Sequence, residues 1–211
     1  MTLGAIRRSI DQRTLIAENA AELFAQRGYA ATSMNEIAEA SQLSKPGLYH
    51  HFSDKAEVLL HITDGHVSRL VEIVTAVEAR KLPPDQLLPN LIAAFMAEYA
   101  QAQSAHRVLT EDVRFLSTEA QARVLDKERV VVQVFANAVA ALRPDLKEAQ
   151  LHKVLTMFLF GMLNWMFTWF RADGFFSYEQ MAPIAIELFL NGVSGVNTAT
   201  LALDNRAIES P

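Results

Sequence analysis

The residues from Thr32 to Lys55 constrain the fold most strongly, because they predict two short helices joined by a tight turn. Ser33 and Glu36 form an S-x-x-E capping box, which is typical of the start of a helix. Ser44 is a second N-cap, and Pro46 falls in the first turn of the second helix, where its missing N–H is not needed. This arrangement is typical of proteins that place the second helix in a groove of DNA.

The second short helix has an apolar side and a polar side. Leu48 and Phe52 are four residues apart, so we expect both side chains to face inward. The other residues of this helix are left to point outward: Lys45, Gly47, Tyr49 and His50. The outer surface of the helix is therefore expected to be basic and aromatic.

Composition restricts the kind of DNA binding that the chain can perform. The 211 residues carry a net charge of −5, and phosphate affinity comes from Lys and Arg, so a protein that coats DNA non-specifically is excluded. The absence of cysteine excludes disulfides, thiolate zinc sites and cysteine nucleophiles. No apolar secretory signal is visible near the N-terminus, and we expect a cytoplasmic protein.

Nearly every segment has helical periodicity and none shows sustained two-residue alternation, so the sequence predicts an all-α fold of about nine helices. Besides the two short helices, the expected ranges are 11–27, 54–82, 85–103, 105–116, 118–143, 147–172 and 178–195. Gly28 suits a left-handed C-terminal cap of the first helix. We divide the chain into a three-helix DNA-binding domain (1–53), a ligand-binding and dimerisation domain (54–200) and a tail (201–211).

Two apolar segments near the C-terminus predict a contact between two copies of the chain. Residues 154–170 carry no charge and approach a membrane-span pattern, but the segment is shorter than the ~20 residues that a span needs. A helix that is apolar all round is alternatively buried on two sides in a soluble protein. Residues 184–193 have a similar bias. We therefore predict no membrane segment and a homodimer through the helices near 147–172 and 178–195.

The N-terminal motifs resemble those of the tetracycline-repressor-like (TetR) family of bacterial transcription regulators. The family pattern is a G-[YF] pair, a T-[ST]-x-x-x-I-A helix, an S-[KR]-x-x-[LI]-Y helix and an F-x-x-K-x-x-x-L segment. The matching residues are Gly28-Tyr29, Thr32-Ser33 with Ile37-Ala38, Ser44-Lys45 with Leu48-Tyr49, and Phe52 with Lys55 and Leu59. The family commonly has Gly where this chain has Gln42. If the backbone of Gln42 has a positive φ, the non-glycine residue destabilises the fold by about 1 kcal/mol.

The resemblance implies which residues contact DNA. Base edges would be approached by Lys45, Pro46 and Gly47. Ser33 and Ser44 begin helices on the same surface, and free helix N–H groups suit phosphate. Arg7, Arg8 and Arg13 form either an arm over the minor groove or a frayed basic tail. Contacts with phosphates are implied for four residues: Thr32, Tyr49, His50 and Lys55.

The C-terminal half is similar to acyl-CoA-responsive regulators of fatty-acid and steroid degradation. The similarity rests on a G-x-x-N-W-x-x-x-W-F-R pattern from Gly161 to Arg171, followed by Gly174. An apolar pocket for a small hydrophobic effector would be lined by Tyr99, Phe115, Phe135, Met162, Trp165 and Trp169, or these residues are plain core or dimer packing. CoA phosphates would meet Arg114, Arg123, Lys127 and Arg129, unless these are solvated.

These patterns predict a repressor that a small hydrophobic effector, such as an acyl-CoA thioester, releases from a palindromic double-stranded DNA operator. One alternative is a regulator of efflux that senses hydrophobic drugs or aromatic compounds, and a remote one is a helical enzyme or interaction module. No nucleophile elbow, P-loop or dinucleotide fingerprint is present, so we expect no catalytic residue and no cofactor. His61 and His66 are not on one helix face and His106 stands alone, so no metal site is expected.

Overall fold

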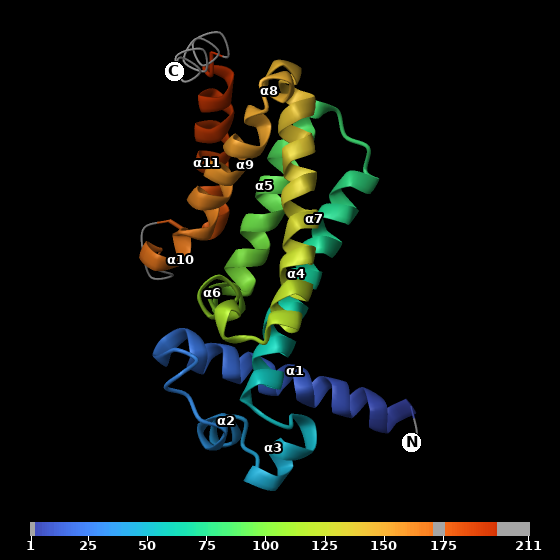
Figure 1. The fold of residues 1–211 in the computed structure, drawn as a ribbon, viewed down its shortest axis with the longest axis vertical. Coiled ribbons are helices and arrows are strands. Elements are labelled where there is room, and N and C mark those ends of the chain that lie inside the picture. The colour runs from blue at the N-terminus through green and yellow to red at the C-terminus, as the bar shows by residue number, and fades with distance from the viewer. Residues whose placement is uncertain (1–2, 171–175, 198–211) are drawn as a thin grey trace, which may run out of the picture. The chain divides into compact units, whose positions relative to one another are not determined.

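The computed structural model describes residues 3–170 and 176–197 (Figure 1). Within these ranges the secondary structure is helical throughout and includes no strand, which confirms the predicted all-α class. The predicted tail at 201–211 lies outside the described residues, as do Arg171 and Gly174 and the side chains of Arg7 and Arg8.

The chain packs as two compact units. The head unit comprises residues 1–69 and 102–128, and the body unit comprises residues 70–101 and 129–211. Two long helices, α4 (Lys55–Ala79) and α7 (Thr118–Leu142), contribute residues to both units. Packing thus groups 102–128 with the N-terminal residues, while the division of function between 1–53 and 54–200 stays a prediction.

The head unit is built around α1 (Leu3–Arg27), which begins eight residues before the predicted Asp11. The helix packs against α2 (Met34–Ala40) and α6 (Gln103–Asp112), and α2 packs against α3 (Lys45–His51). A short 3-10 helix, η1 (Val113–Phe115), follows α6. Gly28 ends α1 with φ +84°, as its sequence position predicts. The centre of the unit is formed by Ile16, Phe24, Ile37, Leu48, Phe52, Val58 and Leu59.

The body unit contains α5 (Pro84–Gln101) and α11 (Tyr178–Ser194), which pack side by side (Figure 1). α11 also contacts α9 (Leu151–Asn164). Three buried rings from α5, α7 and α9 meet edge to face, with Phe135 4.8 Å from Phe95 and 4.9 Å from Phe160 between ring centroids. Such aromatic contacts add directional packing to the burial of apolar area.

The single helix predicted over 147–172 is wrong, because this segment forms α8 (Pro144–Glu148), α9 and α10 (Met166–Trp169). Gln150 has φ +58°, which interrupts the helix between α8 and α9. At the second break the N–H and hydroxyl of Thr168 both donate to the Trp165 carbonyl, closing a tighter turn. Within the described residues these two breaks add two short helices to the predicted count of about nine. None of the described helices is long and apolar enough to cross a membrane.

Two buried histidines meet inside the head unit, so the expectation that His106 stands alone is wrong. His66 Nε2 of α4 lies 3.3 Å from His106 Nδ1 of α6. Burial lowers the pKa of His66 to about 4. Burial, together with the neighbouring His66, lowers the pKa of His106 to about 3. Both imidazoles are therefore neutral at pH 7.

We expect this pair to make the fold sensitive to acid. The imidazoles titrate near 6.5 when unfolded and far lower when folded, so protons bind the unfolded chain first as the pH falls. The stability that the two neutral imidazoles contribute is complete above pH 6.5 and is lost progressively down to pH 4 to 3. Between pH 7 and 5 the free energy of unfolding should decrease by about 4 kcal/mol. Urea unfolding at the two pH values measures the change. A His66→Gln/His106→Gln variant should show a clearly smaller decrease, and an equal decrease would contradict the assignment.

Candidate DNA-binding surface

The first helix of the predicted motif begins with the expected capping box. The Ser33 hydroxyl accepts the Glu36 N–H at 3.3 Å, and Glu36 Oε2 accepts the Ser33 N–H at 2.8 Å. Arg27 of α1 pairs with the same carboxylate at 2.9 Å. Hydrogen bonds from Ser33 lower the pKa of Glu36, which keeps the carboxylate ionised and the cap closed.

The turn between α2 and α3 contains a non-glycine residue in a left-handed conformation. Gln42 has φ +56°, so its backbone conformation destabilises the fold by about 1 kcal/mol relative to the glycine that is common in the family. Beyond the turn, Ser44 Oγ accepts the Gly47 N–H at 3.2 Å, which confirms Ser44 as the N-cap of α3. A Cβ atom at Gly47 would lie 3.2 Å from Ser44 Oγ, so a side chain there would crowd this cap.

α3 presents the predicted polar surface. Leu48 and Phe52 are fully buried, which confirms that they face inward. Gly47 is half-buried, and the Tyr49 side chain is 44% exposed. The remaining predicted contacts on this helix and its cap are exposed: Ser44, Lys45, Pro46 and His50. The buried side of α3 thus packs into the head unit, and its exposed side can contact a large ligand.

Thr32 and Lys55, two predicted phosphate ligands, take part in closing the loop before α2. Thr32 is only 2% exposed, and its hydroxyl donates to the Gly28 carbonyl at 3.0 Å. Lys55 Nζ donates to the carbonyls of Tyr29 and Thr32, each at 2.7 Å, and lies 4.4 Å from the Tyr29 ring centroid. Motif spacing could not reveal these loop contacts. The phosphate contacts of both residues stay predictions.

The comparisons with known proteins match both halves of the chain. Residues 16–62 match the bacterial regulatory proteins of the tetR family, and residues 81–193 match the tetracyclin repressor-like C-terminal domain. The second match alone covers more than half of the chain. The protein belongs to the TetR family. The family confirms a DNA-binding regulator of transcription that responds to a ligand.

Individual TetR relatives are similar over most of the chain. A TetR-family regulator from Bordetella parapertussis is 33% identical, covers 88% of this chain and 97% of its own, and superposes with a TM-score of 0.81. The repressor KstR2 of Mycolicibacterium smegmatis is 26% identical over 87% of this chain and 91% of its own. AibR in complex with isovaleryl coenzyme A and operator DNA is 24% identical, and the match covers 84% of this chain and 97% of AibR. The TM-score of 0.72 shows that the two chains share a fold. The match to the activator FasR spans only 42% of that protein.

The six predicted effector ligands are divided between the two units. Phe115 lies in the head unit, stacked on Tyr29 with ring centroids 5.2 Å apart. The other five belong to the body unit: Tyr99 and Phe135 are buried, Met162 is half-buried, and Trp165 and Trp169 are exposed. The Tyr99 hydroxyl donates to Asn164 Oδ1 at 3.0 Å, which fixes the end of α9. The assignment of these residues to an effector pocket stays a prediction.

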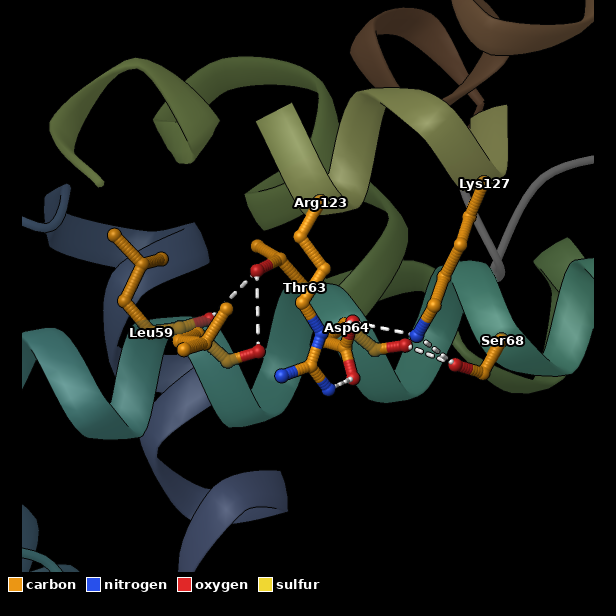
Figure 2. A network of polar contacts seen from close by, with 7 residues as sticks. Leu59, Thr63, Asp64, Ser68, Arg123 and Lys127 are labelled. Carbon is orange, nitrogen blue, oxygen red and sulfur yellow. Dashed lines mark hydrogen bonds and ion pairs between the residues drawn. The ribbon is translucent and has the colours of Figure 1, made fainter. Parts of the chain in front are cut away.

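Two cations predicted to meet CoA phosphates are instead engaged within the TetR head unit (Figure 2). Asp64 of α4 accepts bonds from Arg123 at 2.7 Å and from Lys127 at 2.5 Å, both on α7. Lys127 also donates to Ser68 at 2.8 Å. Burial alone would raise the pKa of Asp64, but the hydrogen bonds from Lys127 and Arg123 lower it on balance. This network ties the helix that follows α3 to α7.

Proposed function

We propose that this TetR-family regulator is a cytoplasmic homodimeric repressor that leaves a palindromic operator when a small hydrophobic effector binds. The observation that carries the DNA-binding part is α3, which is buried through Leu48 and Phe52 and exposed through Lys45, Tyr49 and His50. One short helix of an acidic protein binds phosphate weakly, so two copies on successive turns of the duplex are needed. The relatives described above regulate transcription, and the proposal assigns no catalysis.

An exposed apolar set on α9, α10 and α11 supports the dimer. Phe158 is 68% exposed and Leu188 is 64% exposed, although large apolar side chains normally avoid water. The set lies at helical spacing of three and four residues on α9 and of four on α11. Its members are Val154, Met157, Phe158, Trp165, Trp169, Ile184 and Leu188. A second copy related by a twofold axis would bury it in a four-helix interface.

An acyl-CoA thioester is the effector that the similarities favour. AibR, which shares the fold, was solved with isovaleryl coenzyme A and operator DNA. The tryptophan pattern beginning at Gly161 is similar to regulators that sense such thioesters. A ligand changes DNA binding only if it binds one conformation better than the other, and the network around Asp64 gives α7 a direct contact with the helix that follows α3. Hydrophobic drugs or aromatic compounds, as sensed by regulators of efflux, are the alternative.

The effector proposal is tested on the intact protein with DNA from both flanks of its own gene. Footprinting should first locate a palindromic site. Isovaleryl-CoA, palmitoyl-CoA, free palmitate and a cationic dye are then compared by thermal shift and by release of the labelled DNA. We expect an acyl-CoA to raise the melting temperature and release the DNA, with free CoA as the control. Stabilisation by the dye alone would overturn the acyl-CoA assignment in favour of drug sensing, and tighter DNA binding would overturn the repressor mechanism.

A further inference from the structure

A single arginine of α1 reaches the end of the DNA-reading helix. The guanidinium of Arg13 donates through Nη1 to the carbonyl of His51, the last residue of α3. It also lies over the ring of Phe52, 4.0 Å from the centroid. Its Nη2 lies 3.0 Å from Glu57 Oε1 in the first turn of α4. One side chain therefore contacts the end of α3, its C-cap residue and the beginning of α4.

The carboxylate that receives Arg13 also fixes the junction between α3 and α4. Glu57 Oε2 accepts the Ser53 N–H at 2.7 Å and the Ser53 hydroxyl at 2.9 Å. The Glu57 N–H in turn donates to Asp54 Oδ1 at 2.8 Å. The short connection from α3 to α4 is thus held by side chains on both sides. Arg13 links this connection to α1.

We infer that Arg13, acting through Glu57, is a positioning residue that sets the orientation of α3 for base reading. α3 has seven residues, and helices this short do not hold their conformation or direction without tertiary contacts. The last carbonyls of a helix lack intrahelical partners, so a donor at His51 fixes the helix at its end. The guanidinium carries N–H donors on two separate nitrogens, so Nη1 and Nη2 reach the carbonyl and the carboxylate in different directions, whereas a lysine here would have one donor atom on a shorter side chain.

This role differs from the minor-groove arm considered for Arg13. An arm would direct the guanidinium toward DNA, whereas here it is directed at a backbone carbonyl, a ring and a carboxylate of its own chain. The two roles also predict opposite effects on operator binding when the charge of Glu57 is removed. If Arg13 contacted DNA, removing the negative charge of Glu57 would leave binding unchanged or tighten it. If Arg13 positions α3, the same change weakens operator binding.

The test compares operator and random duplexes across salt concentrations for Arg13→Met, Arg13→Lys and Glu57→Gln. Arg107→Met, which removes an exposed i,i+4 pair with Glu111 on α6, is the control. We expect Arg13→Met to weaken operator binding about tenfold while random-duplex binding and the salt slope change little, since no phosphate contact is lost. Arg13→Lys should resemble Arg13→Met, and Glu57→Gln should weaken operator binding several-fold.

The inference is overturned if Arg13→Met weakens both duplexes equally and lowers the salt slope by about 0.9 for each lost contact, as a phosphate ligand would. It is also overturned if Arg13→Lys restores wild-type binding or if Glu57→Gln binds the operator at least as tightly as wild type. Glu57→Gln keeps an oxygen that can accept from Ser53, so it decides the question even if Arg13→Met does not fold. Failure of the wild-type protein to bind any duplex would instead contradict the proposed function.

Discussion

A variant carrying both Lys45→Ala and Tyr49→Ala should lose specific operator binding. Both side chains lie on the exposed side of α3, and neither supports the core of the head unit. A contact with a base or phosphate is worth about 1–3 kcal/mol, and in a dimer each substitution acts twice. Loss of four contacts should weaken binding by at least about 10³-fold. Titration of a labelled operator fragment, followed by fluorescence anisotropy, measures the change.

The control for this variant is Lys147→Ala, which removes one exposed positive charge from α8 in the body unit. It should bind the operator within about twofold of wild type, because the proposal assigns no DNA contact to α8 and a single exposed charge contributes little by itself. The melting temperature of the double variant should stay close to that of wild type. Retained operator affinity in a folded double variant would contradict the assignment of α3 as the reading helix.

Replacing Phe158 and Leu188 with aspartate should convert the dimer into monomers. Burying a large apolar side chain contributes about 1.5–3 kcal/mol, and twofold symmetry doubles the effect of each substitution. Four carboxylates placed in the same interface would add desolvation and repulsion. Light scattering should give 23.5 kDa, the mass of one chain, instead of twice that value. Operator affinity should fall with dimerisation, because one copy reaches only one half-site.

Val130→Asp is the matched control for the dimer variant. Val130 is 49% exposed on α7 and does not belong to the apolar set of α9 to α11. It should leave the mass and the operator affinity unchanged, although it also replaces an exposed apolar side chain with a carboxylate. A Phe158→Asp/Leu188→Asp protein that stays dimeric would contradict the proposed interface, even if its DNA binding were intact.

The sequence was sufficient for the local features that depend on short-range chemistry. Ser33 and Ser44 cap the two short helices as their spacing predicts, because a hydroxyl reaches N–H groups only two or three residues away. Burial of Leu48 and Phe52 follows from helical periodicity in the same way. Helical periodicity along the chain decided the fold class, and the two N-caps placed α2 and α3.

Contacts across long sequence separations could not be predicted from the sequence. Nothing in the spacing of Asp64 and Lys127, or of Arg13 and Glu57, indicates that these side chains meet. The break at Gln150 was missed for a different reason, since glutamine rarely adopts a left-handed conformation and gives no turn signal. The effector residues were the least predictable, because aromatic side chains at helical spacing suit a core, an interface or a pocket equally well.

The contacts of Lys55 have a practical consequence for binding measurements. Its ammonium group donates to carbonyls on either side of the loop that leads into α2. Reagents that acylate lysine would remove this charge and free the loop. Coupling the protein to a sensor chip through its amines would then lower the apparent affinity by loosening this loop, in addition to blocking the DNA contacts predicted for Lys45 and Lys55. Assays that immobilise the oligonucleotide and leave the protein unmodified avoid this artefact.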